Sequence, residues 1–203
     1  MDNGHVHIGT TPLDTARQRW KRLFKVISGF EDVIYRLAGS TEGRIRSGYR
    51  IYTIPFADSA ARAAAANFSL ESADDVNRLA RDTSGGNRFN GINLTNIYKE
   101  NRPRTVEFRY FNSSLDPKQL QANVKIANAV MVAAEKARTK DSADGNTVVT
   151  DTIKKRGNLL KGYSRARHDR SNSTVAKFVD ILFSRKKDKN EILSVFSRNR
   201  WAN

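Results

Sequence analysis

Residues 105–134 read TVEFRYFNSSLDPKQLQANVKIANAVMVAA and contain both a strand pattern and a helix pattern. Polar and apolar residues alternate over 105–111, which is typical of a strand buried on one face. Glu107 and Arg109 therefore point to the same side of that strand. The two residues alone are compatible with a structural ion pair or with half of a site for an anionic substrate.

A helix is predicted to begin directly after this strand. Asp116 is a candidate N-cap, Pro117 suits the first helical position, and Gln119 completes a spacing similar to a capping box. The following residues are apolar on more than one helical face, which predicts a deeply buried helix.

Composition limits the class of protein. The 203 residues, 38% of them hydrophobic, suffice for one folded domain, with or without a small appendage. The absence of cysteine excludes disulfides, thiolate metal sites and a cysteine nucleophile. No apolar run reaches membrane-spanning length and no signal peptide is recognisable, so we expect a cytoplasmic protein without a membrane span.

The net charge of +15 is concentrated near the C-terminus. Residues 151–203 hold 14 lysines and arginines against 5 acidic residues. Helices are predicted there at 148–163, 173–184 and 189–197. This basic helical region suggests an alternative function, nucleic-acid binding, although such charge runs also occur on ordinary solvated helices.

The rest of the chain predicts helices with short connections. An amphipathic helix is expected at 12–37, closed by Gly39. An alanine-rich helix at 58–67 and a helix at 70–81 capped by Ser69 follow.

Two histidines, His5 and His7, are separated by one residue near the N-terminus. On an extended segment they face the same way and can present both imidazoles to one metal ion or one phosphate. For an isolated pair of this spacing, an ordinary polar strand face or a disordered terminus is the commoner explanation.

These motifs resemble the amidoligase family, a distant relative of glutamine synthetase. The family has a strand T-V-E-F-R followed by an aromatic residue, Asn, a turn, L-D-P and an alanine-rich helix, and an H-x-H strand lies earlier in its chain. The resemblance implies an α+β fold whose antiparallel sheet and packed helices form part of a glutamine synthetase-like catalytic domain at 1–138. A linker at 139–147 and a basic helical extension at 148–203 would follow.

The resemblance also implies a reaction, ATP-dependent carboxylate–amine ligation through an acyl phosphate. ATP and Mg²⁺ (or Mn²⁺) would be the cofactors, and a peptide or small-molecule carboxylate and an amine the substrates. His5 and Glu107 would bind the metal, and Arg109 would stabilise the transferred phosphoryl group or the substrate carboxylate. The residues expected to hold nucleotide or substrate are His7, Arg46, Arg50, Arg88 and Asn93.

One departure from the family pattern concerns the N-terminus. The family has upstream strands with paired acidic residues, whereas this sequence starts four residues before His5. We therefore expect an incomplete sequence, an upstream half supplied by a partner chain or second subunit, or an inactive copy.

Overall fold

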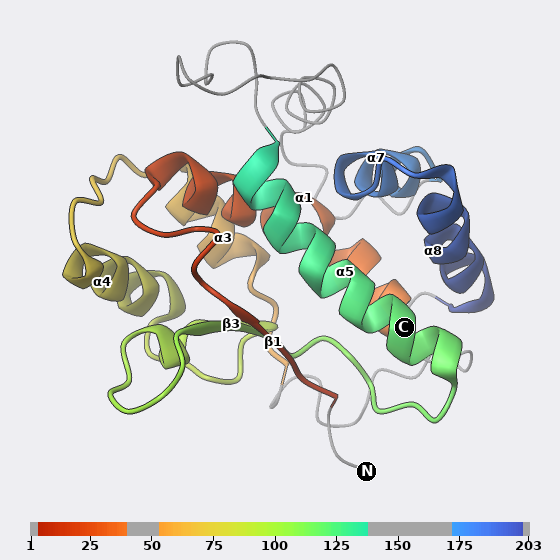
Figure 1. Cartoon of the computed structure of the whole chain (residues 1–203), viewed down its shortest axis with the longest axis horizontal. Helices are drawn as coiled ribbons and strands as arrows, with labels where there is room; N and C mark the ends of the chain where they lie inside the picture. The colour runs from red at the N-terminus through yellow and green to blue at the C-terminus, as the bar shows by residue number, and fades with distance from the viewer. Residues whose placement is uncertain (1–3, 40–52, 138–171, 201–203) are drawn as a thin grey trace.

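The computed structural model describes residues 4–39, 53–137 and 172–200. Within these ranges the protein is α+β, with helices packed around a small antiparallel sheet of strand order β1-β3-β2 (Figure 1). This confirms the predicted fold class. The helices are α1 (Arg17–Ala38), α3 (Ala57–Ala65), α4 (Ala73–Ser84), α5 (Pro117–Lys136), α7 (Asn172–Leu182) and α8 (Lys186–Arg198). The strands are β1 (Val6–Gly9), β2 (Ile92–Asn93) and β3 (Thr105–Phe108), and a 3₁₀ helix, η1 (Thr95–Ile97), follows β2.

The sheet has one apolar and one polar face because side chains alternate along each strand. Phe108 of β3 pairs with Val6 of β1 and with Ile92 of β2, which forms a continuous apolar row. Helix α5 packs against β1, and Phe108 and Ile92 are fully buried. The polar side chains of the next row therefore point away from the core.

Helix α5 begins as the sequence predicts, but its third residue has another role. The Asp116 carboxylate accepts a hydrogen bond from the backbone N–H of Lys118 at 2.9 Å, and Pro117 is the first helical residue. Gln119 completes no capping box. Its buried amide donates to Leu37 O at 2.7 Å, because the C-terminus of α1 lies beside α5 and its last carbonyls need partners from outside the helix.

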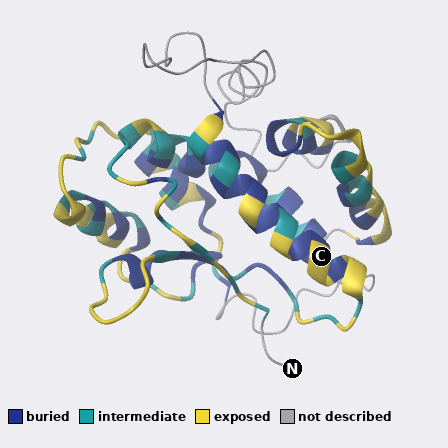
Figure 2. Cartoon of the chain, in the orientation of Figure 1, coloured by how far each residue is buried: buried dark blue, intermediate teal, exposed yellow. Residues whose placement is uncertain are grey.

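The N-terminal half of α5 is less buried than its composition suggests. Leu120 and Val124 are 47% and 54% exposed, whereas Val130, Met131 and Ala133 in the C-terminal half are at most 1% exposed. Figure 2 shows this change along the helix. A wide apolar surface thus predicts burial correctly only where a neighbouring element covers it.

Helix α1 is the main partner of α5 and also packs on α3. It starts at Arg17, five residues later than predicted, since the chain turns at Asp14 with a φ of 46°. Trp20 fixes this turn through an indole N–H donated to Asp14 O at 2.8 Å. Gly39 ends the helix as predicted, in an extended conformation rather than a left-handed one.

The apolar face of α1 includes one acidic residue, Glu31, which is 3% exposed. Its carboxylate accepts hydrogen bonds from the backbone N–H groups of Phe56 and Ala57 at 2.7 and 2.8 Å and from the Tyr110 hydroxyl at 2.6 Å. Burial raises the pKa of Glu31, although the three hydrogen bonds oppose that shift. Glu31 thus caps the N-terminus of α3 from a different helix.

The two shorter helices lie close to their predicted positions. Helix α3 matches the alanine-rich segment, and α4 is capped by Ser72 instead of Ser69. The Ser72 hydroxyl accepts from the N–H of Asp75 at 3.2 Å while the Asp75 carboxylate accepts from the N–H of Ser72 at 3.0 Å, which is a complete capping box.

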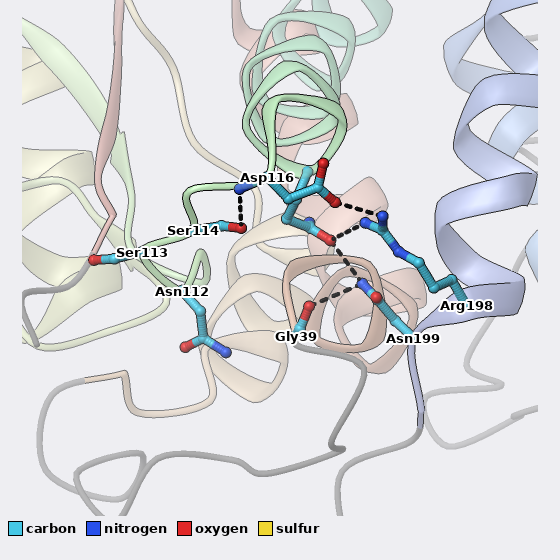
Figure 3. Close-up of a pocket in the computed structure, with 8 residues that line it drawn as sticks. Gly39, Asn112, Ser113, Ser114, Asp116, Arg198 and Asn199 are labelled. Atoms are coloured by element: carbon cyan, nitrogen blue, oxygen red, sulfur yellow. Dashed lines mark hydrogen bonds and ion pairs between the residues drawn. The ribbon is translucent and has the colours of Figure 1, made fainter.

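Helices α7 and α8 pack against α1 and α5 and share the hydrophobic core with them (Figure 1). The rings of Phe178 and Phe30 are 5.1 Å apart. At the end of α8, the Asn199 amide donates to Leu37 O at 3.0 Å. It also donates to Gly39 O at 2.9 Å (Figure 3). The predicted helix at 148–163 lies outside the described residues, and the domain boundaries stay predictions.

Within the described part of the chain, no helix is both long enough and apolar enough to cross a membrane.

Candidate functional site

The polar face of the sheet gathers its side chains around Glu107, at the centre of β3. In the sheet register Glu107 stands between His7 of β1 and Asn93 of β2. His5 lies two residues before His7 and therefore on the same face, and Arg109 lies two residues after Glu107. The three strands thus bring together five of the predicted site residues.

The Glu107 carboxylate is the common partner in this group. Its Oε1 lies 3.0 Å from His5 Nδ1, 2.8 Å from an Arg109 terminal nitrogen and 3.9 Å from His7 Nε2. Its Oε2 accepts a hydrogen bond from the Asn93 amide at 2.5 Å. Glu107 and Arg109 thus lie on the same side of the strand, as predicted, and form an ion pair.

Asn93 is oriented by its own turn. Its side-chain oxygen accepts the backbone N–H of Thr95 at 2.9 Å, which directs the NH₂ group to Glu107. Asn93 is 3% exposed, so both ends of the amide are used inside the protein. Asn93 is thus a buried asparagine whose side-chain oxygen and NH₂ group are both hydrogen-bonded within the protein.

Glu107 is ionised at neutral pH. Burial of the carboxylate opposes ionisation, but hydrogen bonds from His5 and Asn93 and the positive charge of Arg109 outweigh it and lower the pKa to about 2. The Glu107 side chain is only 6% exposed, whereas those of His5 and His7 are 29% and 45% exposed. A fixed negative charge therefore lies beneath two imidazoles that face solvent.

Arg109 and Arg88 both lie beside the ring of Phe89. Their guanidinium carbons are 5.9 and 4.8 Å from the ring centroid. Arg109 is mostly buried, while Arg88 is exposed. Arg88 is thus placed next to the cluster on the chain that leads into β2, and Arg46 and Arg50 lie outside the described residues.

Two neighbours of the cluster were not predicted as site residues. The Thr105 hydroxyl lies 3.3 Å from His7 Nδ1. The Phe89 ring lies beside the guanidinium groups of both Arg88 and Arg109. Thr105 is two residues before Glu107 on the same strand, and this spacing is the signal that identifies it. Phe89 carries no comparable signal, since one aromatic residue in a loop is common.

The cluster has donors that suit a metal ion. His5, His7 and Glu107 each offer one ligand atom, and the three atoms lie within 4.8 Å of one another. Two imidazole nitrogens and one carboxylate oxygen can bind a divalent cation, while the exposure of both histidines leaves its outer side open to a further ligand.

Two cavities in the described part of the protein are not lined by His5, His7 or Glu107. One of 180 Å³ is lined by Gly39, Ser114, Asp116, Arg198 and their neighbours, where α8 meets α1 and α5 (Figure 3). Another, of 490 Å³, lies between Asn67 and Asp82 around the start of α4. We therefore assign the candidate site to the polar sheet face on the basis of its chemistry.

Comparisons with known proteins identify the family of the chain. The family model described as "Putative amidoligase enzyme" matches residues 4–131, which include β1, β2, β3 and most of α5. Searches of curated proteins and of solved structures returned no match. The family match indicates a ligase-type function. Because it spans well over half of the 203 residues and contains the whole His–Glu–Arg cluster, the chain belongs to the amidoligase family.

Proposed function

We propose that this chain is an ATP-dependent carboxylate–amine ligase, acting by itself or as part of a larger enzyme. Such a ligase transfers the γ-phosphoryl group of ATP to a substrate carboxylate, which releases ADP. An amine then attacks the acyl phosphate, an amide bond forms, and phosphate leaves. Family membership supports the ligase class, and the observation that carries the proposal is the ionised, buried Glu107 paired with Arg109 on an open polar surface.

Glu107 would act through its charge and not as a proton donor. With a pKa of about 2 it stays deprotonated near neutral pH, so it is unsuited to general acid catalysis. A permanent carboxylate in this position holds cations, including the guanidinium of Arg109 at 2.8 Å.

Arg109 is the residue best placed to stabilise developing negative charge. Its guanidinium is held by Glu107 and lies beside the Phe89 ring, so it is ordered before any substrate binds. Preorganised cationic donors are an effective means of stabilising a transferring phosphoryl group. Arg88, exposed beside the same ring, would contact nucleotide or substrate, as would Arg46 and Arg50.

A divalent cation fits the His5, His7 and Glu107 donors, and when bound it would neutralise phosphate charge. Mg²⁺ fits this donor set poorly, since it prefers oxygen ligands in octahedral geometry and two of the three donors are nitrogen. We therefore propose His5, His7 and Glu107 as cation ligands without assigning the ion to Mg²⁺. Magnesium would enter with the phosphates of ATP.

Asn93 is proposed to position Glu107. Both ends of its amide already have partners inside the protein, which leaves little capacity for a nucleotide. Peptides are the proposed substrate class, because the resemblance to the family favours peptide-like carboxylates.

The test is a trapping assay for the acyl phosphate. The protein is incubated with MgATP, a mixture of short acidic peptides and hydroxylamine as the amine, and hydroxamate formation is measured together with ADP release. Peptides labelled with ¹⁸O in the carboxylate should pass one label to the released phosphate. We expect both signals in the wild type and their loss in Glu107→Ala and Arg109→Ala.

Arg102→Ala provides a matched control, since Arg102 is an exposed arginine in the loop before β3. It should retain full activity. Normal hydroxamate formation in Glu107→Ala or Arg109→Ala, with the fold verified by circular dichroism, would contradict the site assignment. Label-free phosphate with active protein would contradict the acyl phosphate.

The nucleic-acid hypothesis gains no support from the described C-terminal helices. Lys189 forms an ion pair with Asp180, and Arg198 pairs with Asp116 of the α5 N-terminus. Their apolar residues face the core that they share with α1 and α5. The apolar side chains of these helices, together with Lys189 and Arg198, are thus integrated into the fold, whereas Arg185, Lys186 and Lys187 are exposed.

A further inference from the structure

We infer that His5, His7 and Glu107 form a site for a borderline transition-metal ion such as Zn²⁺, and that this site discriminates against Mg²⁺. The inference rests on the proposed function in one respect, namely that the cluster lies at the reaction site. It goes further by naming the class of ion.

Donor chemistry is the first argument. Mg²⁺ and Ca²⁺ are hard ions that take carboxylate, carbonyl and water oxygens, whereas imidazole suits Zn²⁺, Fe²⁺, Co²⁺ and Ni²⁺. Two histidines and one carboxylate are the ligand set of several catalytic zinc sites and of non-haem iron sites. Within the described residues, the fold brings His5, His7 and Glu107 together as three potential metal ligands.

Geometry is the second argument. Donors about 2.1 Å from one tetrahedral ion lie about 3.4 Å from each other. The distances from Glu107 Oε1 to His5 Nδ1 and His7 Nε2, 3.0 and 3.9 Å, bracket that value. The backbone register of β1 and β3 sets the separation of His7 from Glu107, because these two residues are directly paired. All three donor atoms lie within 4.8 Å of one another, so the side chains must draw closer together to surround one ion.

The surrounding hydrogen bonds are the third argument. Metal ligands are usually oriented by outer partners that also tune their basicity. Here Asn93 donates to the oxygen of Glu107 that faces away from His5, and Thr105 Oγ lies 3.3 Å from the nitrogen of His7 that faces away from Glu107. Glu107 Oε1, which also pairs with Arg109 at 2.8 Å, and His7 Nε2 thus lie on the same side of the cluster, 3.9 Å apart.

Exposure indicates the kind of site. His5 and His7 remain 29% and 45% exposed, so three protein donors cover one side of the ion and the other side faces solvent. Structural zinc sites are closed by four protein ligands, whereas catalytic sites keep a position for water or substrate. The cluster has the open form.

The experiment uses untagged, metal-stripped protein and Co²⁺ as a spectroscopic probe for the zinc class. We expect one Co²⁺ per chain with visible absorption bands, displacement of Co²⁺ by an equivalent of Zn²⁺, and no displacement by millimolar Mg²⁺. His7→Gln and Glu107→Gln should each weaken Co²⁺ binding by at least about tenfold, while their circular dichroism spectra remain unchanged.

His168→Gln is the matched control, since His168 is the third histidine of the sequence. It should bind Co²⁺ as the wild type does. Displacement by Mg²⁺, or wild-type Co²⁺ affinity in a His5→Gln, His7→Gln double variant, would overturn the inference. So would loss of the Co²⁺ spectrum in His168→Gln.

These outcomes are separable from the ligase proposal. Selective Co²⁺ and Zn²⁺ binding without hydroxamate formation would refute the ligase and leave the metal site standing. Hydroxamate formation by protein that binds Mg²⁺ as well as Zn²⁺ at this cluster would refute the selectivity and leave the ligase standing.

Discussion

Replacing Glu31 by alanine should strongly destabilise the protein although Glu31 lies outside the candidate site. The substitution removes the acceptor for the backbone N–H groups of Phe56 and Ala57 and for the Tyr110 hydroxyl. Glu31 and the three residues that donate to it are all buried, so the three donors would be left without an acceptor in a low-dielectric interior.

The magnitude follows from these three hydrogen bonds. Loss of an N-cap acceptor costs about 0.5–2 kcal/mol, and a buried donor left without a partner costs about 1–3 kcal/mol. Some of that cost is offset because the buried carboxylate is itself unfavourably desolvated, as its raised pKa indicates. We expect Glu31→Ala to lower the free energy of unfolding by about 3–5 kcal/mol.

The assay is equilibrium urea denaturation at neutral pH, followed by circular dichroism and by tryptophan fluorescence. Glu100→Ala is the control, because Glu100 is an exposed acid in the turn before β3 and its loss should change stability by less than about 0.5 kcal/mol. A loss below about 1 kcal/mol in Glu31→Ala would show that the three donors find other partners and would refute the reasoning.

Glu31 also predicts a pH dependence. Its folded-state pKa is raised above the ordinary value of 4.5, so the folded protein binds more protons than the unfolded chain in the interval between the two values. The stabilisation of the protonated form is present below pH 4.5 and is lost as pH rises through the folded-state pKa. Glu31→Gln, which cannot ionise, should lack this component. Parallel unfolding curves for the two proteins from pH 4 to pH 8 would contradict the shift.

Two further substitutions test the packing around the site and the docking of α8. Gly91→Ala should lower the free energy of unfolding by about 1–3 kcal/mol, because a Cβ there would lie 2.2 Å from the Tyr110 ring. Gly9→Ala is the control, since a Cβ at Gly9 meets nothing within 4 Å and should leave the stability nearly unchanged. Equal effects of the two substitutions in urea unfolding would refute the steric argument. Asn199→Ala should cost about 1–3 kcal/mol by removing the amide that donates to Leu37 O and Gly39 O, and unchanged urea stability would show that α8 contributes little to holding α1.

The sequence by itself determined strand β3, the approximate positions of the described helices and part of the candidate cluster. Period-two alternation located β3 and placed Glu107 beside Arg109, and the Asp116–Pro117 pair located the start of α5. These features depend on neighbours within a few residues, and local backbone preferences are sufficient to predict them. Resemblance to the amidoligase family then placed His5 in the same site.

Only the tertiary structure decided which of the remaining polar residues work together. Gln119 appeared in sequence as part of a local cap but hydrogen-bonds to α1, and Glu31 lay unnoticed within an apolar helix face until α3 and Tyr110 surrounded it. Likewise, the 3.0 and 3.9 Å distances that make a cation site depend on pairing β1 with a strand about one hundred residues later. Such contacts join residues distant in sequence, so no local periodicity specifies them, and burial and register arise only when the chain has folded.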